Sequence, residues 1–220
     1  CPLSVGADGG GSIRIPAGLC GVTGLKATFG RVSEYGAAPL CWSVAHVGPI
    51  GTTVRDTALG YVAMAGADPL DPLSCHQPAV HLEGFGDLDL SGIKIGIYEP
   101  WFEHASDPLV SQCRERLKEL EGHGAKLVPI EVPDLDLVRL AHLTTIASEM
   151  RTAMDRYYGP HRQVLGLDVR TNLALASRFT NLDYIKAQRI RTQCIATMKT
   201  IFEKVDLIAT PTTGCTAPAI

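Results

Sequence analysis

The sequence predicts an α/β fold in which a mixed, largely parallel sheet is flanked by helices. Strand and helix patterns alternate from residue 53 to the end of the chain. A strand, a helix and a second strand follow one another between residues 93 and 132, in the order of a βαβ unit with parallel strands. Such alternation is typical of α/β proteins.

The composition is that of an ordinary globular chain of 220 residues, with a formal charge of −3, 45% hydrophobic residues and 20% charged residues. This length can bury a sizeable core, which excludes disorder and coiled coil. The chain has no concentrated basic run, so we expect no nucleic-acid partner. No apolar stretch reaches the roughly 18 residues that a membrane helix needs.

Seven scattered cysteines without a C-x-x-C pair predict free thiols and no metal site. Free thiols are typical of a reducing compartment, so we expect an intracellular protein, either cytoplasmic or associated with endomembranes. The sequence encodes no membrane association of its own, and it leaves a homodimer open.

The first 50 residues are unusually poor in charge and rich in glycine. Residues 1–36 hold nine of the 22 glycines, and residues 1–50 carry five charged side chains. We expect buried backbone here, where the main chain can closely approach a ligand or another segment. A helix is then expected over residues 53–64, followed by a long surface loop to about Asp89.

The remaining elements follow from caps and periodicity. Residues 93–98 alternate as a strand, Asp107 is expected to cap a helix with Pro108 at its first position, and residues 126–132 form the second strand. Long helices are expected over residues 134–158 and 181–204, and a buried strand ends at Pro211.

One face of the helix expected over residues 134–158 carries an apolar stripe, for which a core role is favoured over an acyl-chain channel: Leu137, Leu140, Leu143, Ile146, Met150 and Met154.

Three consecutive glycines precede Ser12 in the segment Gly6-Ala-Asp-Gly-Gly-Gly-Ser-Ile-Arg-Ile-Pro. This segment is not a phosphate-binding loop, because no Gly-Lys-Ser/Thr follows and no G-x-G-x-x-G fits it. Two interpretations remain. The segment is a buried turn, or it is a nucleophile loop whose backbone N–H groups stabilise an oxyanion beside the Ser12 hydroxyl.

The nucleophile interpretation lacks an obvious base. The seven histidines are spread singly, at positions 46, 76, 81, 104, 123, 142 and 161. His142 and His161 lie in or near helical segments, where we expect a solvated or packed role. Neither a G-x-S-x-G elbow nor an S-x-x-K box is present.

Three early motifs together resemble the amidase signature family: Asp8-Gly-Gly-Gly-Ser-Ile-Arg-Ile-Pro-Ala, Leu19-Cys-Gly-Val-Thr-Gly-Leu-Lys-Ala-Thr-Phe-Gly-Arg-Val-Ser and Val47-Gly-Pro-Ile-Gly-Thr-Thr-Val-Arg-Asp. Later segments, including Asp183-Tyr-Ile-Lys-Ala-Gln-Arg, are most similar to the plant-type fatty acid amide hydrolases of that family. The resemblance implies a hydrolase of amide bonds with a Ser, cis-Ser, Lys triad and without metal or cofactor.

The resemblance also assigns roles to residues of the loop. It implies that Ser12 is the nucleophile and that the backbone amides of Gly9, Gly10, Gly11 and Ser12 form the oxyanion hole. The implied partner is a small-molecule amide, with fatty acid amides such as N-acylethanolamines favoured. The alternatives are a small-amide amidase, an amidotransferase subunit of the A type, or a catalytically inactive truncated fragment.

By the same resemblance, residues 1–220 are a partial domain that lacks the N-terminal Lys and cis-Ser segments and the C-terminal part. Ser4 lacks the Gly-Ser-Ser setting of the bridging serine, and Lys26 matches a family element for which a structural role is expected.

Several further residues lie near the loop in the sequence or in the expected fold. We expect Asp8 and Arg14 to pair across the loop and fix its shape, and Cys20 and Cys41 to be small buried residues without a catalytic role. Thr210 and Thr212 either line a pocket at the end of a strand or serve only a turn.

Overall fold

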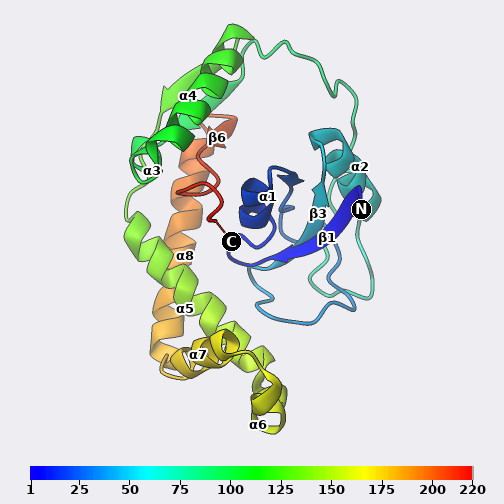
Figure 1. Ribbon diagram of the computed structural model, residues 1–220, viewed down its shortest axis with the longest axis vertical. Coiled ribbons are helices and arrows are strands. Elements are labelled where there is room, and N and C mark those ends of the chain that lie inside the picture. The colour runs from blue at the N-terminus through cyan, green and yellow to red at the C-terminus, as the bar shows by residue number, and fades with distance from the viewer. Residues whose placement is uncertain (220) are drawn as a thin grey trace.

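The computed structural model describes residues 1–219, which form two three-stranded sheets surrounded by helices (Figure 1). One sheet is antiparallel, with the strand order β1-β3-β2, and the other is parallel, with the order β5-β4-β6. The mixed α/β class is therefore confirmed, and its parallel strands lie in the second sheet.

The antiparallel sheet is built by the Gly-rich part of the chain. β1 (Leu3–Asp8) pairs along its whole length with β3 (His46–Gly51), and β2 (Thr23–Gly24) pairs with the other side of β3. The expectation of a generally buried region is wrong, because β1 is an edge strand and Val5 on it is 63% exposed. What is buried is the middle strand β3, where His46, Gly48, Pro49 and Gly51 are buried.

Two helices accompany this sheet, α1 (Arg14–Cys20) and α2 (Val54–Met64). The helix expected over 53–64 is confirmed, and Thr53 and Asp56 close its first turn as a reciprocal capping box. α2 packs closely on the sheet at Gly60, where a Cβ atom would lie 3.0 Å from the Pro49 side chain.

The parallel sheet confirms the expected βαβ unit. β4 (Lys94–Ile97) lies between β5 (Lys126–Pro129) and β6 (Leu207–Ala209), and α3 (Glu99–Glu103) and α4 (Asp107–Gly122) connect β4 to β5. The expected buried strand at the end of the chain is only half-buried, because β6 lies at the sheet edge. The core of this region consists of Ile95, Ile97, Phe102, Leu117 and Ala125.

One predicted cap was wrong by a residue. Ser106 holds the N-cap position of α4 with an extended backbone (φ −67°, ψ 144°), so Asp107 is already the first helical residue. Asp107 still lies in the first turn, where its negative charge interacts favourably with the positive end of the helix dipole.

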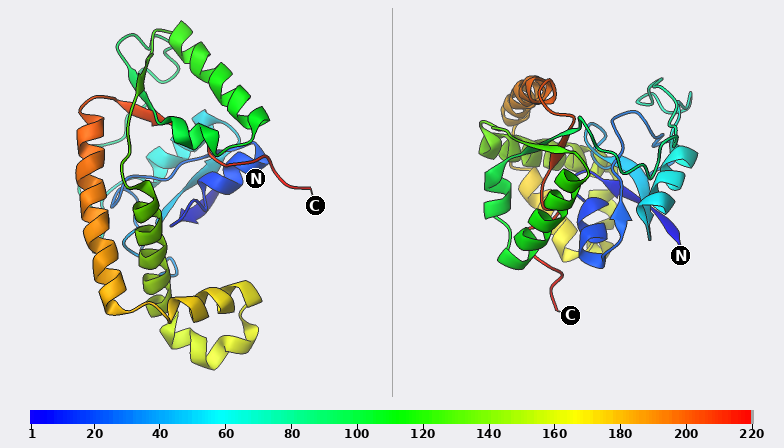
Figure 2. Two further views of the ribbon diagram at one scale, coloured as in Figure 1. Left: turned by 90° about the vertical axis from the view of Figure 1, so that its left-hand side faces the viewer. Right: turned by 90° about the horizontal axis from the view of Figure 1, so that it is seen from above.

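The remaining helices form a long arm beside the two sheets: α5 (Leu135–Ala153), α6 (Asp155–His161), the 3-10 turn Arg162–Val164, α7 (Leu167–Ala176) and α8 (Asn181–Phe202). Figure 1 and the left view of Figure 2 place α5 alongside α8. The expectation of a single helix over 134–158 is wrong, since α5 ends at Ala153 and α6 begins at Asp155. The helix expected over 181–204 is confirmed, with Thr180 as its N-cap.

The apolar stripe of α5 does not form the core that was expected. Leu137, Leu140 and Leu143 are about half exposed. The buried face instead carries small and polar side chains, namely Ala141, Thr144, Thr145, Ala147 and Glu149. These short or hydrogen-bonding side chains let α5 approach its neighbours closely, which hydropathy alone does not predict.

No helix within residues 1–219 is both long enough and apolar enough to cross a lipid bilayer.

Candidate active site

Ser12 lies in the short loop that joins β1 to α1. Its side chain is exposed, and Gly11 before it is buried, with a φ of +120° that side-chain-bearing residues rarely adopt. The Gly11 carbonyl accepts a hydrogen bond from the Ile15 N–H at 2.7 Å, so the loop leads directly into the helix. The backbone therefore presents Ser12 at a helix N-terminus after a sharp turn.

A buried carboxylate fixes the shape of this loop. Asp8, the last residue of β1, has no exposed surface. Its Oδ2 accepts a hydrogen bond from Arg14 Nε at 2.9 Å, and its Oδ1 accepts one from Arg14 Nη2 at 3.1 Å. The Gly11 N–H donates to Oδ1 at 2.7 Å, and the Ile13 N–H donates to Oδ2 at 3.3 Å. The expected pairing of Asp8 with Arg14 is confirmed.

The electrostatics of Asp8 follow from these contacts. Burial alone would raise the pKa of the carboxyl group, but the hydrogen bonds from Arg14 and the Gly11 N–H outweigh burial and lower this pKa to about 2. Asp8 is therefore ionised at neutral pH and serves as a fixed acceptor rather than as a proton carrier.

The Asp8 contacts distinguish Gly11 from the other residues of the expected oxyanion hole. The Gly11 N–H is engaged by Asp8, so it is not free to stabilise an oxyanion. By contrast, the N–H groups of Gly9, Gly10 and Ser12 donate to no acceptor within the described residues 1–219. The free donors of the loop are thus the N–H groups of Gly9, Gly10 and Ser12, whereas the Gly11 N–H fixes the shape of the turn.

Ser12 faces a cavity of about 240 Å³, whose wall also includes Gly9 and Gly10. The other polar side chains in this wall are Glu34 and His46. Most of the remaining surface is apolar and comes from β1, from residues 37–47 and from Ile146 of α5. The cavity therefore combines a hydroxyl, free backbone donors and one ionisable pair in an apolar setting.

The two cysteines near the loop differ in environment. Cys41 is 1% exposed, and burial, followed by the nearby Glu149 charge, raises the pKa of its thiol to about 11. Its Sγ lies 2.6 Å from where a Cβ on Gly9 would be, so it forms the wall behind the loop. Cys20 is exposed at the end of α1, so its expected burial is wrong.

A polar cluster holds residues 41–45 against the helical arm. Glu149 of α5 is 1% exposed, and it accepts hydrogen bonds from the Ser43 N–H at 3.0 Å and from the Tyr184 hydroxyl at 3.0 Å. Arg191 of α8 donates to the Ser43 carbonyl at 2.6 Å. Lys26 donates to the Val44 carbonyl at 2.6 Å, and burial lowers the pKa of this amine. Lys26 thus has a structural contact of the kind expected for it.

Sequence reasoning missed the Glu149 cluster. One signal was present, because Ala141, Thr145 and Glu149 recur every four residues and so share a helix face opposite the leucines.

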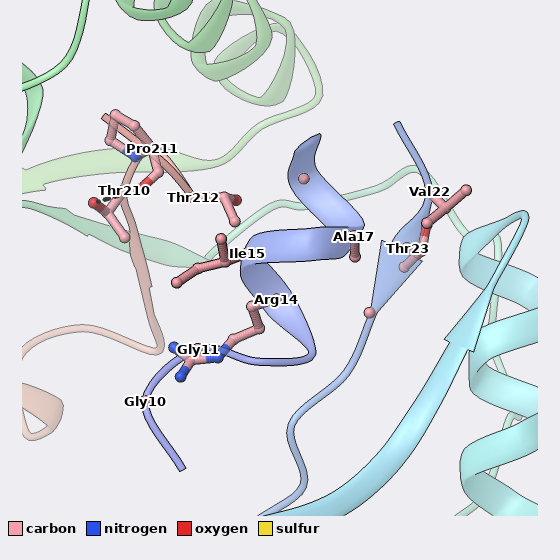
Figure 3. A pocket seen from close by; sticks show the side chains of 12 residues that line it. Gly10, Gly11, Arg14, Ile15, Ala17, Val22, Thr23, Thr210, Pro211 and Thr212 are labelled. Atoms are coloured by element: carbon pink, nitrogen blue, oxygen red, sulfur yellow. Dashed lines mark hydrogen bonds between the residues drawn. The ribbon is translucent and has the colours of Figure 1, made fainter. Parts of the chain in front are cut away.

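A second cavity of about 520 Å³ lies on the other side of the glycine loop. Figure 3 shows it between Gly10, Gly11 and Arg14 on one side and the residues after β6 on the other. Thr210 and Thr212 line this cavity, which agrees with the pocket-lining role and not with the alternative that they serve only a turn. Gly10 belongs to both cavities, so the loop separates two spaces with Ser12 facing the smaller one.

Within residues 1–219, no group of three or more His, Cys, Asp or Glu side chains is arranged to hold a metal ion.

Comparison with known proteins then decides the family. A family model described as Amidase matches residues 1–220. The chain belongs to the amidase signature family. It is 41% identical to a fatty acid amide hydrolase from Medicago truncatula, over 100% of this chain and 37% of the relative. It is also 35% identical to the A-type subunit of the glutamyl-tRNA(Gln) amidotransferase of Persephonella marina, over 96% of this chain and 49% of the relative.

Solved structures of the amidase signature family agree. A protein complex that bears on the evolutionary origins of an s-triazine catabolic enzyme superposes with a TM-score of 0.87 at 32% identity, covering 100% of this chain and 47% of the other. The A-type subunit of the glutamyl-tRNA(Gln) amidotransferase of Thermotoga maritima gives a TM-score of 0.85 at 29% identity, covering 100% and 48%. The chain thus spans less than half of the lengths of these proteins.

The resemblance seen in the motifs around Ser12 is therefore confirmed as family membership, and the amidase signature fold expected from it is confirmed as well.

Proposed function

We propose that Ser12 is the nucleophile of an enzyme that hydrolyses carbon–nitrogen amide bonds. One observation carries the proposal: the exposed Ser12 side chain lines an apolar cavity together with Gly9 and Gly10, whose N–H groups have no acceptor within residues 1–219. A hydroxyl beside free, preorganised donors is the arrangement that acyl transfer requires.

In the proposed reaction, Ser12 Oγ attacks the amide carbonyl carbon, and the carbonyl π electrons move to the oxygen. The N–H groups of Gly9, Gly10 and Ser12 stabilise that negative charge. The electron pair then returns, the C–N bond breaks, and the amine leaves with a proton. Water cleaves the resulting acyl ester at Ser12 to give a carboxylic acid and the free hydroxyl.

The proton of Ser12 needs an acceptor, and the family resemblance implies a neutral lysine that acts through a bridging cis-serine. We propose that both residues belong to a part of the whole protein outside these 220 residues. On this proposal, the 220-residue chain by itself is inactive, because the hydroxyl is not activated.

The proposed substrates are fatty acid amides, including N-acylethanolamines. Support comes from the plant relatives that carry the name fatty acid amide hydrolase, with 37–41% identity over the whole chain. The second candidate is a small amide or glutamine, because an amidase and several A-type amidotransferase subunits also match at 31–36% identity. An intracellular location is proposed from the seven free cysteines.

The test uses a fluorophosphonate probe on the whole protein. We expect Ser12→Ala to abolish labelling and amide hydrolysis, while the control Ser4→Ala, on the exposed strand β1, leaves both unchanged. Competition by long acyl amides over short amides and glutamine would support the favoured substrate class. Persistent labelling of the Ser12→Ala protein would refute the assignment of the nucleophile.

A further inference from the structure

The cavity beside Ser12 contains a histidine that the proposed reaction does not use. His46 of β3 is buried, and its Nδ1 lies 3.0 Å from Oε1 of Glu34. An ionised carboxylate only accepts hydrogen bonds, so Nδ1 carries the hydrogen of this contact. The ring of Phe29 lies edge-to-face with the imidazole at a centroid distance of 5.1 Å. The imidazole is therefore held in one orientation by two neighbours.

Both members of the pair are anchored by the surrounding main chain. His46 begins β3, where it is the ladder partner of Asp8. The Glu34 N–H donates to the buried carboxylate of Asp71 at 2.8 Å, and the Ser33 hydroxyl donates to Asp68 at 2.7 Å. The loop after α2 thus fixes the segment that presents Glu34, and the pair is preorganised.

The second ring nitrogen of His46 is free. Within residues 1–219, Nε2 has no hydrogen-bond partner, and it is not among the fully enclosed polar atoms that lack one. In the neutral imidazole with hydrogen on Nδ1, Nε2 carries a lone pair and accepts. In this neutral form, His46 presents a preorganised acceptor to the same cavity that Ser12 lines.

Few alternatives exist in this cavity for a polar group of a ligand. Its side-chain lining is alanine, valine, leucine, isoleucine and Cys41, apart from Ser12, Glu34 and His46. A hydroxyl or N–H group of a ligand buried there without a partner would lose its hydrogen bond to water, which weakens binding. The cavity volume of about 240 Å³ is below the range of roughly 300–1,000 Å³ of pockets for drug-sized ligands. The part of a substrate that enters this cavity is therefore small.

We propose that the Glu34–His46 pair is a specificity element that selects amides carrying a hydroxyl or N–H donor close to the scissile carbonyl, with His46 Nε2 accepting the hydrogen bond. This inference rests on the proposed function, since it takes Ser12 as the point of attack. The donor belongs either to the amine part of the amide, as in an N-(2-hydroxyethyl) amide, or to the acyl part.

The experiment compares two substrate pairs with the whole protein. The first pair is an N-(2-hydroxyethyl) amide and the N-propyl amide of the same fatty acid. The second pair is an amide with and without a hydroxyl on the acyl chain near the carbonyl. We expect the wild type to prefer the hydroxylated member of one pair by about tenfold in kcat/KM, the value of one hydrogen bond, and the responding pair identifies the side that enters the cavity.

Variants then assign the preference to His46. His46→Leu should reduce the ratio to about one, whereas Glu34→Gln, which keeps an acceptor for Nδ1–H, should retain most of it. The control His123→Leu, at the end of α4, should leave it unchanged. A wild-type ratio near one for both pairs, or an unchanged ratio in His46→Leu, would overturn the proposal.

Fluorophosphonate labelling of Ser12 separates this proposal from the proposed function. Labelling retained by His46→Leu shows that the loop is intact, so the ratio is then a test of recognition alone. If His46→Leu does not fold, Glu34→Leu releases the imidazole instead and should lower the ratio, and an unchanged ratio in that variant would overturn the proposal. Labelling that survives Ser12→Ala would refute the nucleophile without reference to His46.

Discussion

The two sheet regions are organised around opposite kinds of buried group. In the antiparallel region, the fully buried centre beside the loop is the charged carboxylate of Asp8, with directional hydrogen bonds from Gly11, Ile13 and Arg14. In the parallel region, the centre is an apolar cluster that includes Ile95 and Phe102. Hydrophobic burial stabilises without fixing direction, whereas charge-assisted hydrogen bonds fix geometry. Stability and the reactive geometry should therefore respond to different substitutions.

Phe102→Ala should give the largest loss of stability. Phe102 is 2% exposed, and truncation of such a side chain leaves a cavity at a cost of about 3–5 kcal/mol. The rate of fluorophosphonate labelling per folded molecule should stay unchanged, since the parallel core does not touch the Ser12 loop. Urea unfolding and labelling measure the two effects, with Phe85→Ala at a half-exposed position as the control. A labelling rate that falls further than the folded fraction would show that the parallel core also affects the geometry of the Ser12 loop.

Asp8→Asn should have the opposite effect, with a large fall in labelling and a small loss of stability. The amide keeps one acceptor oxygen but turns an NH₂ group toward donors of the loop, so the backbone N–H groups lose their shared acceptor. We expect labelling to fall by about 10²–10³-fold, comparable to loss of an oxyanion donor, with a stability loss of only about 1–3 kcal/mol. Asp56→Asn, in the exposed cap of α2, is the control for the chemical change.

The pH dependence checks the same carboxylate. The folded-state pKa of Asp8 is lowered to about 2, from an unfolded value near 3.9. Its contribution is therefore fully present above about pH 4 and is lost as the pH falls through 2. The stability difference between wild type and Asp8→Asn should shrink over this window. A difference that is constant down to pH 2 would mean that the Asp8 charge does not stabilise the fold.

The contrast also explains what could be predicted from the sequence. The Ser12 loop, the Asp8–Arg14 pair, α2 and α8 depend on residues close together in the chain, so local patterns identify them. The two capped helices α2 and α8 begin where their Thr-x-x-Asp motifs place them. Family membership was predictable for the same reason, since its motifs are local.

The contacts that complete the cavity could not be predicted in this way. Ser43 and Glu149 are 106 positions apart and meet only because α5 folds back over residues 41–45. The leucine stripe of α5 gave a wrong prediction of the buried face, because hydrophobicity does not show which segments pack against a helix. Ser43 and Gln188 pack there and donate hydrogen bonds to Glu149 and Thr145. His46 was not assigned a role from the sequence, because its partner Glu34 is identified only by tertiary structure.

The smallest expected effect comes from a matched pair within the loop itself. Gly11 has a φ of +120°, so Gly11→Ala is strained and should cost about 1–3 kcal/mol in urea unfolding. Gly10 has no such conformation, and a Cβ there would meet Ile146 at an ordinary 3.5 Å. Gly10→Ala should therefore stay within about 1 kcal/mol of the wild type. Equal costs for the two variants would mean that the positive φ of Gly11 does not set the turn, and the Asp8 contacts would then have to set it alone.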